Sequence, residues 1–211
     1  MTARANDRVV NGRSLHAQAY EASAMLHANC IAGGFLPTLG TRFLSIVYRC
    51  VDEHPEAVLI TESVDGRVVG FVAGTIGRAS LRSILVRHPF RAIAALAPAL
   101  ASRAKLRGIW RVARYASRGD GSTGGWPTAE LLSIAVAPEA RGSGVAERLF
   151  RSLERELSVR GVERFKIIVG SNLIPAQRFY AKMGCTEIAR IRIHGGAESV
   201  VLARTAGGSQ P

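Results

Sequence analysis

The sequence of 211 residues predicts one domain of the α+β (mixed α/β) class, with helices packed on a mixed β-sheet that is mostly antiparallel. Three observations lead to this fold class. Residues 57–73 read as two strands joined by a turn, residues 130–183 alternate strand–helix–strand–helix, and residues 185–203 read as a second strand pair. Strands joined by a tight turn are antiparallel, whereas strands joined through a helix are parallel. Both kinds of pairing are therefore expected.

The N-terminal part predicts two helices, at residues 14–32 and 35–52, separated by a Gly-Gly pair. Apolar side chains recur at helical intervals in the second one. They are Leu36, Leu39, Phe43, Ile46, Val47 and Cys50. Strands are expected at residues 57–61 and 68–73. The Asp65-Gly66 pair between these strands tolerates the positive φ of a hairpin turn.

The C-terminal part has the most regular pattern of the chain. It predicts strands at residues 130–136 and 164–169 and helices at residues 144–159 and 173–183. A closing hairpin is expected from residues 185–193 and 199–203, joined through residues 194–196. The last residues, 205–211, are predicted to form a loose tail.

A basic section at residues 78–118 interrupts this pattern. It holds ten Arg and Lys residues and no Asp or Glu, so the rest of the chain carries only +2 of the total net charge of +12. Its apolar residues have helical spacing, broken by Pro89 and Pro98, which predicts two or three short helices before a Gly/Ser/Thr-rich loop at residues 119–125.

Three interpretations of the basic section stay open. It could be a helical cap whose arginines face water, or an amphipathic surface that docks on anionic lipid or on an acidic partner. Nucleic-acid binding is less favoured, because Phe90, Trp110 and Tyr115 do not form a regular series of stacking side chains.

Composition narrows the class of protein. The first ten residues lack the apolar core of a signal peptide, and the longest apolar run has ten residues, at 92–101, against the ~20 that span a bilayer. A cytoplasmic protein is expected, located at the membrane surface only if the basic section docks there. Cys30, Cys50 and Cys185 have no metal-site spacing and are expected to be free thiols. No metal is predicted.

The most informative stretch is Arg141-Gly142-Ser143-Gly144-Val145-Ala146, between a predicted strand and a predicted helix. Small residues at a helix start expose backbone N–H groups at the positive end of the helix dipole, where anions bind. A P-loop would require a lysine that is absent here, and a dinucleotide fingerprint would require a small residue where Glu147 stands. A different anionic ligand is therefore expected.

The stretch resembles motif A of the GNAT superfamily of N-acetyltransferases, (Gln/Arg)-x-x-Gly-x-(Gly/Ala), with Arg141, Gly144 and Ala146 at the specified positions. Residues 172–184 resemble motif B of the same family. The resemblance covers residues 14–204 apart from the basic section. It implies a GNAT fold of about six or seven strands in one domain at residues 1–204, with residues 78–126 as an insertion between strands 3 and 4.

The resemblance also implies acetyl-CoA as the acyl donor. Its pyrophosphate would lie against residues 141–146. Its pantetheine arm and the thioester oxygen would meet backbone N–H groups of a strand that a bulge splays from its neighbour. The cofactor-binding residues implied in this way are Ile134, Ala135, Val136, Arg141, Gly142, Ser143, Gly144, Val145, Ala146, Asn172 and Ala176.

Two side chains carry the chemistry that the resemblance implies. Tyr180 is the expected general acid for the departing thiolate, and Phe179 beside it is expected in the core. Glu130 is the expected general base for the attacking amine. A tyrosine packed in the core and a solvated glutamate at a strand end stay open as alternatives. Weaker candidates for the base are Glu62, Ser133, His194 and Glu198.

The function expected from these residues is an N-acetyltransferase. It would transfer acetyl from acetyl-CoA to a primary amine of a small molecule, such as an amino sugar, or of a peptide, by direct attack in a ternary complex. Two alternatives remain: a CoA-binding module without catalysis, and a membrane-surface acyltransferase for longer acyl chains. A homodimer is also left open.

Overall fold

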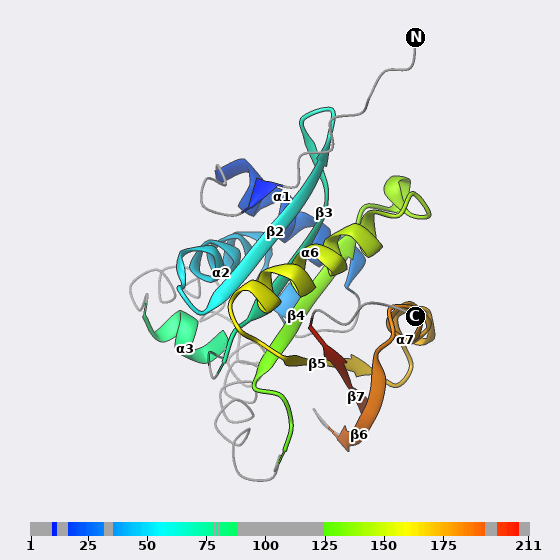
Figure 1. The fold of residues 1–211 in the computed structure, drawn as a ribbon. Helices are drawn as coiled ribbons and strands as arrows, with labels where there is room; N and C mark the ends of the chain where they lie inside the picture. The colour runs from blue at the N-terminus through cyan, green and yellow to red at the C-terminus, as the bar shows by residue number, and fades with distance from the viewer. Residues whose placement is uncertain are drawn as a thin grey trace.

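A computed structural model describes residues 10–11, 17–31, 36–77, 79, 81–87, 125–192 and 198–206. Within these residues the strands form one seven-stranded sheet in the order β1-β2-β3-β4-β5-β7-β6. All neighbouring pairs are antiparallel except β4 and β5, which are parallel. Helices cover both faces of the sheet (Figure 1). The predicted α+β class and the mixed sheet are confirmed.

The first half of the chain follows the prediction with one correction and one additional strand. Its elements are β1 (Val10–Asn11), α1 (Ala17–Cys30), the 3-10 helix η2 (Leu36–Leu39), α2 (Thr41–Glu53), β2 (Ala57–Val64) and β3 (Arg67–Thr75). The second helix is not continuous over residues 35–52. Gly40 has φ 95°, which no α-helical residue adopts, so η2 ends before α2 begins. The two-residue strand β1 was not predicted.

The second half matches the predicted elements to within one or two residues at each end. Its elements are β4 (Ala129–Val136), the 3-10 helix η3 (Pro138–Ala140), α6 (Val145–Val159), β5 (Arg164–Gly170), α7 (Ile174–Lys182), β6 (Thr186–Arg192) and β7 (Glu198–Thr205). Helix α6 is the crossover between the parallel strands β4 and β5. The β6–β7 hairpin is present, and the residues that join it lie outside the described part of the chain.

Two apolar clusters lie on opposite faces of the sheet. On one face, buried side chains of α6, such as Leu149 and Phe150, pack with those of β4, β5 and β7. On the other face, buried side chains of α1 and α2, such as Leu44 and Val47, pack against β2 and β3. Each cluster fixes one set of helices to the sheet, so both sides of β4 are held in place.

Helix α6 lies unusually close to β3 because β3 has glycine where the two meet. A Cβ atom on Gly70 would stand 2.9 Å from side-chain carbons of both Leu149 and Val145. This contact holds the N-terminal turn of α6 against the sheet. The turn that precedes the helix is thereby positioned next to the end of β4.

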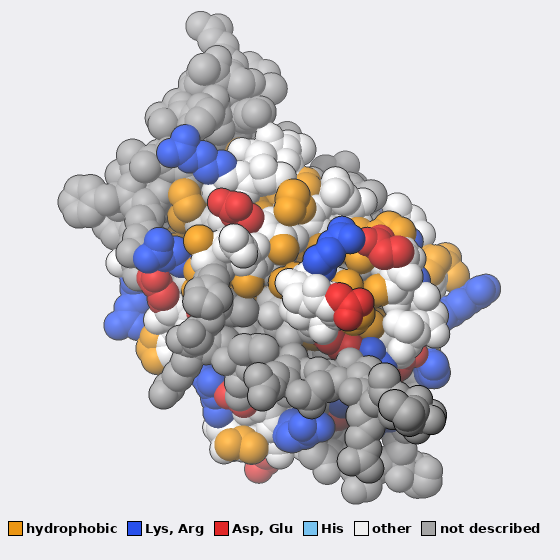
Figure 2. All heavy atoms as spheres, turned by 90° about the horizontal axis from the view of Figure 1, so that it is seen from above, with side chains coloured by type: hydrophobic (Ala, Val, Ile, Leu, Met, Phe, Trp, Pro, Cys, Tyr) orange, Lys and Arg blue, Asp and Glu red, His pale blue; other side chains and the backbone are white. Residues whose placement is uncertain are grey.

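Little of the basic section falls within the described residues. Helix α3 (Leu81–Val86) packs on α2, with Ile84 fully buried, as the apolar spacing of this segment predicts. The predictions for residues 88–124 lie outside the described residues. Where the chain is described, no helix has the length and apolar character to span a membrane. One face of the molecule, seen in Figure 2, carries cationic and anionic side chains interspersed.

Candidate active site

Strand β4 changes partners halfway along its length. A register shift in its pairing with β3 leaves Leu132 as the extra residue of a β-bulge, since Ala73 pairs with Ser133 and Gly74 with Leu131. The pairing of β4 with β5 ends at the same place, at Leu131 and Ile167. Beyond the bulge the two parallel strands are unpaired over their described residues, as the family resemblance implies.

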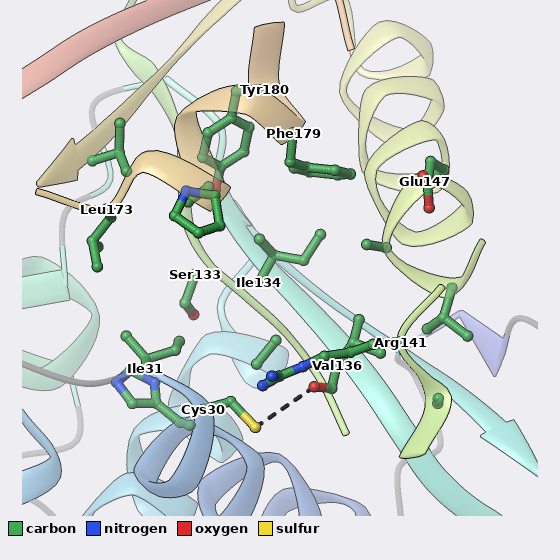
Figure 3. Close-up of a pocket in the computed structure, with 18 of the residues that line it drawn as sticks. Cys30, Ile31, Ser133, Ile134, Val136, Arg141, Glu147, Leu173, Phe179 and Tyr180 are labelled. Atoms are coloured by element: carbon green, nitrogen blue, oxygen red, sulfur yellow. Dashed lines mark hydrogen bonds between the residues drawn. The ribbon is translucent and has the colours of Figure 1, made fainter. Parts of the chain in front are cut away.

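The unpaired edge of β4 presents backbone groups at alternate residues. The N–H of Ala137 donates to the carbonyl of Val69 at 2.8 Å. Backbone groups alternate in direction along an antiparallel strand, so those of Ala135 also face β3, whereas those of Ile134 and Val136 face the gap. The Cys30 thiol donates to the Val136 carbonyl over 3.6 Å from the side of the gap (Figure 3).

The glycine turn follows directly. After η3, Gly142 has φ 78° and Gly144 has φ 81°, a left-handed conformation that glycine adopts without strain. Gly144 is the N-cap of α6 and provides no side chain to accept from the first N–H groups of the helix. These donors and the positive end of the helix dipole form a cradle for an anion. The residues therefore fit the pyrophosphate of acetyl-CoA.

An ion pair between a buried carboxylate and a partly exposed arginine supports this turn. Glu62 on β2 is fully buried, and its Oε1 accepts from two nitrogens of Arg148, with 2.9 Å to Nε. Arg148 Nη1 in turn donates to the Ser143 carbonyl at 2.9 Å. The second oxygen of Glu62 has no hydrogen-bond partner among the described residues. The pair thus connects the sheet to the backbone of the glycine turn.

The edge of β4 and the glycine turn open into one pocket of about 750 Å³. Its walls come from α1, β4, the turn with the start of α6, the end of β5, and α7 (Figure 3). A volume of this size accommodates an elongated ligand. Nine of the predicted cofactor-binding residues line it in the described structure, together with Tyr180. They are Ile134, Ala135, Val136, Arg141, Gly142, Gly144, Val145, Ala146 and Ala176.

Tyr180 projects from α7 into the pocket (Figure 3) and is 6% exposed. Burial raises the pKa of its phenol well above the ordinary value of 10.0, with a smaller contribution from Cys185. The hydroxyl is therefore protonated at neutral pH. Phe179 packs against Phe150, with ring centroids 6.0 Å apart, and also lines the pocket. The sequence predicted only its place in the core.

Glu130 lies at the other end of β4 and does not line the pocket formed by the described residues. Its carboxylate stands 3.4 Å from Lys166 Nζ. Burial raises the pKa of Glu130, and the nearby Lys166 opposes that shift. A raised pKa suits a general base, but the bulge and Ser133 separate Glu130 from Ile134. Its role as the base stays a prediction.

Three further predicted residues lie outside the pocket that the described residues form. Asn172 is exposed, and its Oδ1 would be 2.8 Å from a Cβ on Gly170. Ser143 is exposed and its hydroxyl donates to the Ala140 carbonyl at 2.6 Å. Glu198 is 3.4 Å from Arg190 on the neighbouring strand β6. His194 lies outside the described residues.

The sequence did not indicate the wall formed by α1. His27, Cys30 and Ile31 line the pocket opposite α7. Their spacing on a helix is the same as that of core residues, and they belong to no motif. Ser133, a weak candidate in the sequence, also lies on this wall. Among the described residues, His, Cys, Asp and Glu side chains do not gather in groups of three or more that could hold a metal ion.

Solved structures share this fold over nearly the whole chain. The ribosomal-protein-S18-alanine N-acetyltransferase from Escherichia coli is 13% identical, with a TM-score of 0.58 and coverage of 97% of this chain and 96% of that one. An aminoglycoside 6'-N-acetyltransferase complexed with coenzyme A is 12% identical, with a TM-score of 0.61 and coverage of 97% and 99%. An N-acetyltransferase from Staphylococcus aureus Mu50 is 13% identical, with a TM-score of 0.60 and coverage of 95% and 99%.

Sequence comparison is more decisive than these distant structural matches, which show the fold alone. Among curated proteins, no sequence matches the chain. The sequence model of the Acetyltransferase (GNAT) family matches residues 35–185, which is well over half of the chain. The match includes the bulged strand, the glycine turn and Tyr180. The chain therefore belongs to the GNAT family of acetyltransferases.

Proposed function

We propose that this protein transfers an acetyl group from acetyl-CoA to a primary amine by direct attack within a ternary complex. One observation carries the proposal: the uncapped start of α6, the unpaired edge of β4 and the protonated hydroxyl of Tyr180 share one pocket. These three features supply an anion site, donors for a carbonyl oxygen and a proton donor. A thioester carrier with a pyrophosphate requires all three.

Each part of the pocket has a role in this proposal. The N–H groups of the glycine turn and the start of α6 bind the pyrophosphate, with Arg141 at the rim. The N–H groups of Ile134 and Val136 meet the pantetheine arm and the carbonyl oxygen, which gains negative charge as the amine attacks. Acetyl-CoA supplies the reactive thioester. Tyr180 donates its proton to the sulfur as the carbon–sulfur bond breaks.

The acceptor is proposed by class. The names of two structural neighbours specify a protein alanine and an aminoglycoside as acceptors. A peptide amine and the amine of an amino sugar are accordingly the first classes to test. Glu130 is the general base that the family resemblance implies, and in that role it takes the proton of the amine. Residues 78–118 remain proposed as a contact for an anionic lipid or an acidic partner, to be tested by vesicle sedimentation at low and high salt.

The experiment incubates the purified protein with acetyl-CoA and a library of amines, and follows free CoA and acetylated product by mass. Turnover is expected with at least one class. Tyr180→Phe is expected to lower kcat by about 100-fold, the usual loss when a general acid is removed, without weakening CoA binding in calorimetry. Unchanged kcat in Tyr180→Phe would remove Tyr180 from the acid role. Binding without turnover across the library would favour a non-catalytic CoA module.

A further inference from the structure

Three polar side chains from three elements form a hydrogen-bonded chain beside the pocket. Nδ1 of His27 on α1 is bonded to the hydroxyl of Tyr48 on α2. The same hydroxyl lies 3.2 Å from Oγ of Ser133 on β4. His27 and Ser133 line the pocket, whereas Tyr48 is 2% exposed. The chain therefore opens on the pocket at both ends and is closed from solvent in the middle.

The position of Ser133 results from the bulge. Leu132 packs into the cluster on the α1–α2 face, and Ser133 bonds to Tyr48 on that same face. Two successive residues share one side of the sheet only where a bulge interrupts the alternation. Ser133 is also the neighbour of Ile134, whose N–H faces the gap. An amine that attacks a carbonyl held by Ile134 would thus stand beside Ser133.

The protonation states allow the chain to accept a proton from the pocket. Burial alone lowers the pKa of His27 to about 4, so its imidazole is neutral at pH 7 and has one bare nitrogen. Among the described residues, the titratable groups bonded to His27 or beside it on this wall are Tyr48 and Cys30. Tyr20 and Cys50 belong to the same apolar cluster, and Arg141, Glu147 and Tyr180 line the rest of the pocket. Burial raises the pKa of Tyr48, which is protonated. With Tyr48 donating to His27 Nδ1 and Ser133 donating to Tyr48, lone pairs of Ser133 remain for a ligand.

We propose that Ser133, Tyr48 and His27 form a relay that removes the proton of the acceptor amine. This inference rests on the proposed function. The N–H bond of the attacking amine breaks as Ser133 Oγ gains that proton, Ser133 passes its own proton to Tyr48, and Tyr48 passes its proton to His27 Nδ1. As Nδ1 gains this proton, His27 releases its Nε2 proton to water in the pocket, so the ring changes tautomer and stays neutral. Ser133 touches the substrate, and the other two act through it.

The relay and Glu130 differ in whether the first group that accepts the proton lines the pocket. Ser133 lines the pocket, whereas Glu130 does not line it within the described structure and is 3.4 Å from Lys166. A proton from an amine in the pocket reaches the relay directly, and reaches Glu130 only around the bulge. Variants of the two groups therefore separate the two routes.

The test compares Tyr48→Phe with Tyr20→Phe. Tyr20 is a matched control because its hydroxyl also joins α1 to α2, at 2.8 Å from Asp52, and it does not line the pocket. Tyr48→Phe keeps the ring that packs edge-on against Phe71. At pH 7, with an alkylamine of pKa ~10, Tyr48→Phe is expected to lower kcat roughly 100-fold with KM for acetyl-CoA unchanged, and Tyr20→Phe to change kcat less than about twofold.

The decisive measurement is the pH profile. A relay is dispensable once the amine has lost its proton in solution, so the deficit of Tyr48→Phe should shrink as the pH approaches ~10. Ser133→Ala should show the same shrinking deficit, and adding His27→Gln to Tyr48→Phe should cause little further loss, because the residues act as one unit. If Tyr48→Phe fails to fold, Ser133→Ala still tests the proposal through the same pH profile.

Four outcomes overturn the proposal. A deficit that is constant with pH would show a merely structural role for Tyr48. A pH-dependent deficit in Glu130→Gln with none in Tyr48→Phe would assign the proton to Glu130. Absence of turnover in the unmodified protein with every amine would remove the proposed function and the relay together. Normal turnover in Tyr48→Phe and Ser133→Ala at pH 7 would remove the relay alone.

Discussion

The two ends of the pocket bind by opposite means. At the glycine turn the binding groups are backbone N–H donors, the nearby side chains are exposed or ion-paired, and glycine conformation sets the shape. At the α1 wall the polar groups are the largely buried side chains of His27, Tyr48 and Ser133, all uncharged at pH 7. The first end suits a charged ligand that is always the same. The second suits an acceptor whose proton must be removed.

Because the two ends use different binding groups, different changes should impair them. Backbone N–H donors lose their ligand when a change of φ turns them away from it, and they tolerate most changes of neighbouring side chains. A buried polar network fails when one member is lost or protonated, because the remaining groups are desolvated and unpaired. Conformation should therefore control one end, and protonation the other.

The largest effect is expected at Gly144. Gly144→Val forces a β-branched residue to φ 81°, and its Cβ would lie 3.1 Å from Arg148 Nη1. A left-handed residue with a Cβ costs about 1–2 kcal/mol, and the branches would also cover the N–H donors of α6. Calorimetry should show CoA binding weakened at least ~100-fold.

Gly161→Val is the matched control for this change. Gly161 follows the other end of α6 at φ 77°, with open space around it and no place in the pocket. Its substitution should lower the melting temperature to a similar extent and leave the Kd for CoA unchanged. Equal loss of CoA binding in both variants would show that α6 as a whole, and not the turn, controls the site.

The second prediction concerns protonation at the α1 wall. His27 has a pKa of about 4 in the folded protein against 6.5 in the unfolded chain. Between these values the unfolded chain binds more protons, so this residue makes stability fall as the pH falls from 6.5 to 4, by up to about 3 kcal/mol. His27→Gln removes that contribution. The stability gap between the two proteins should be largest above pH 6.5 and narrow towards pH 4.

Thermal unfolding of both proteins across this range tests the second prediction. Glu130 and Asp52 have raised pKa values and Glu147 a lowered one, and each adds its own pH dependence. All three are present in both proteins, so their effects cancel in the difference. A gap that does not change with pH would mean that His27 titrates alike in the folded and unfolded states.

The contrast between the two ends also explains what the sequence could predict. The β2–β3 hairpin, α6 and the glycine turn were predictable because their signals are local: a turn pair, a 3.6-residue period and a six-residue motif. The relay has no local signal. His27 and Tyr48 are 21 residues apart, and Tyr48 and Ser133 are 85 apart. A polar residue within a helix looks the same in the sequence whether it faces solvent or a pocket.

Glu130 shows a second reason. Its place at the start of β4 was predictable to within one residue. The pocket begins two residues later, at the bulged residue Leu132, which no turn residue marks. Because a bulge reverses which residues share a face, side chains on either side of it cannot be assigned from alternation alone. By contrast, the break in the second predicted helix falls at Gly40, and a glycine is a sequence signal for such a break.

The smallest effect is expected at the ion pair below the glycine turn. Glu62→Gln replaces the ion pair with Arg148 by a weaker hydrogen bond to an uncharged amide, and Arg148 is the group that donates to the Ser143 carbonyl. If about 1 kcal/mol of that loss reaches the turn, CoA should bind about fivefold more weakly. S-acetylpantetheine lacks the pyrophosphate, so its kcat/KM should change less than about twofold.

Glu154→Gln is the control for this pair, since Glu154 also lies on α6 and accepts from Arg204 at 2.7 Å, away from the turn. Glu154→Gln should change neither the binding of CoA nor the kcat/KM of S-acetylpantetheine. The prediction is contradicted if an Arg148 released from its carboxylate attracts the pyrophosphate more strongly. Tighter CoA binding in Glu62→Gln would mean that Glu62 neutralises Arg148 and does not shape the turn. The glycine end of the pocket would then depend on side-chain charge as well as on backbone conformation.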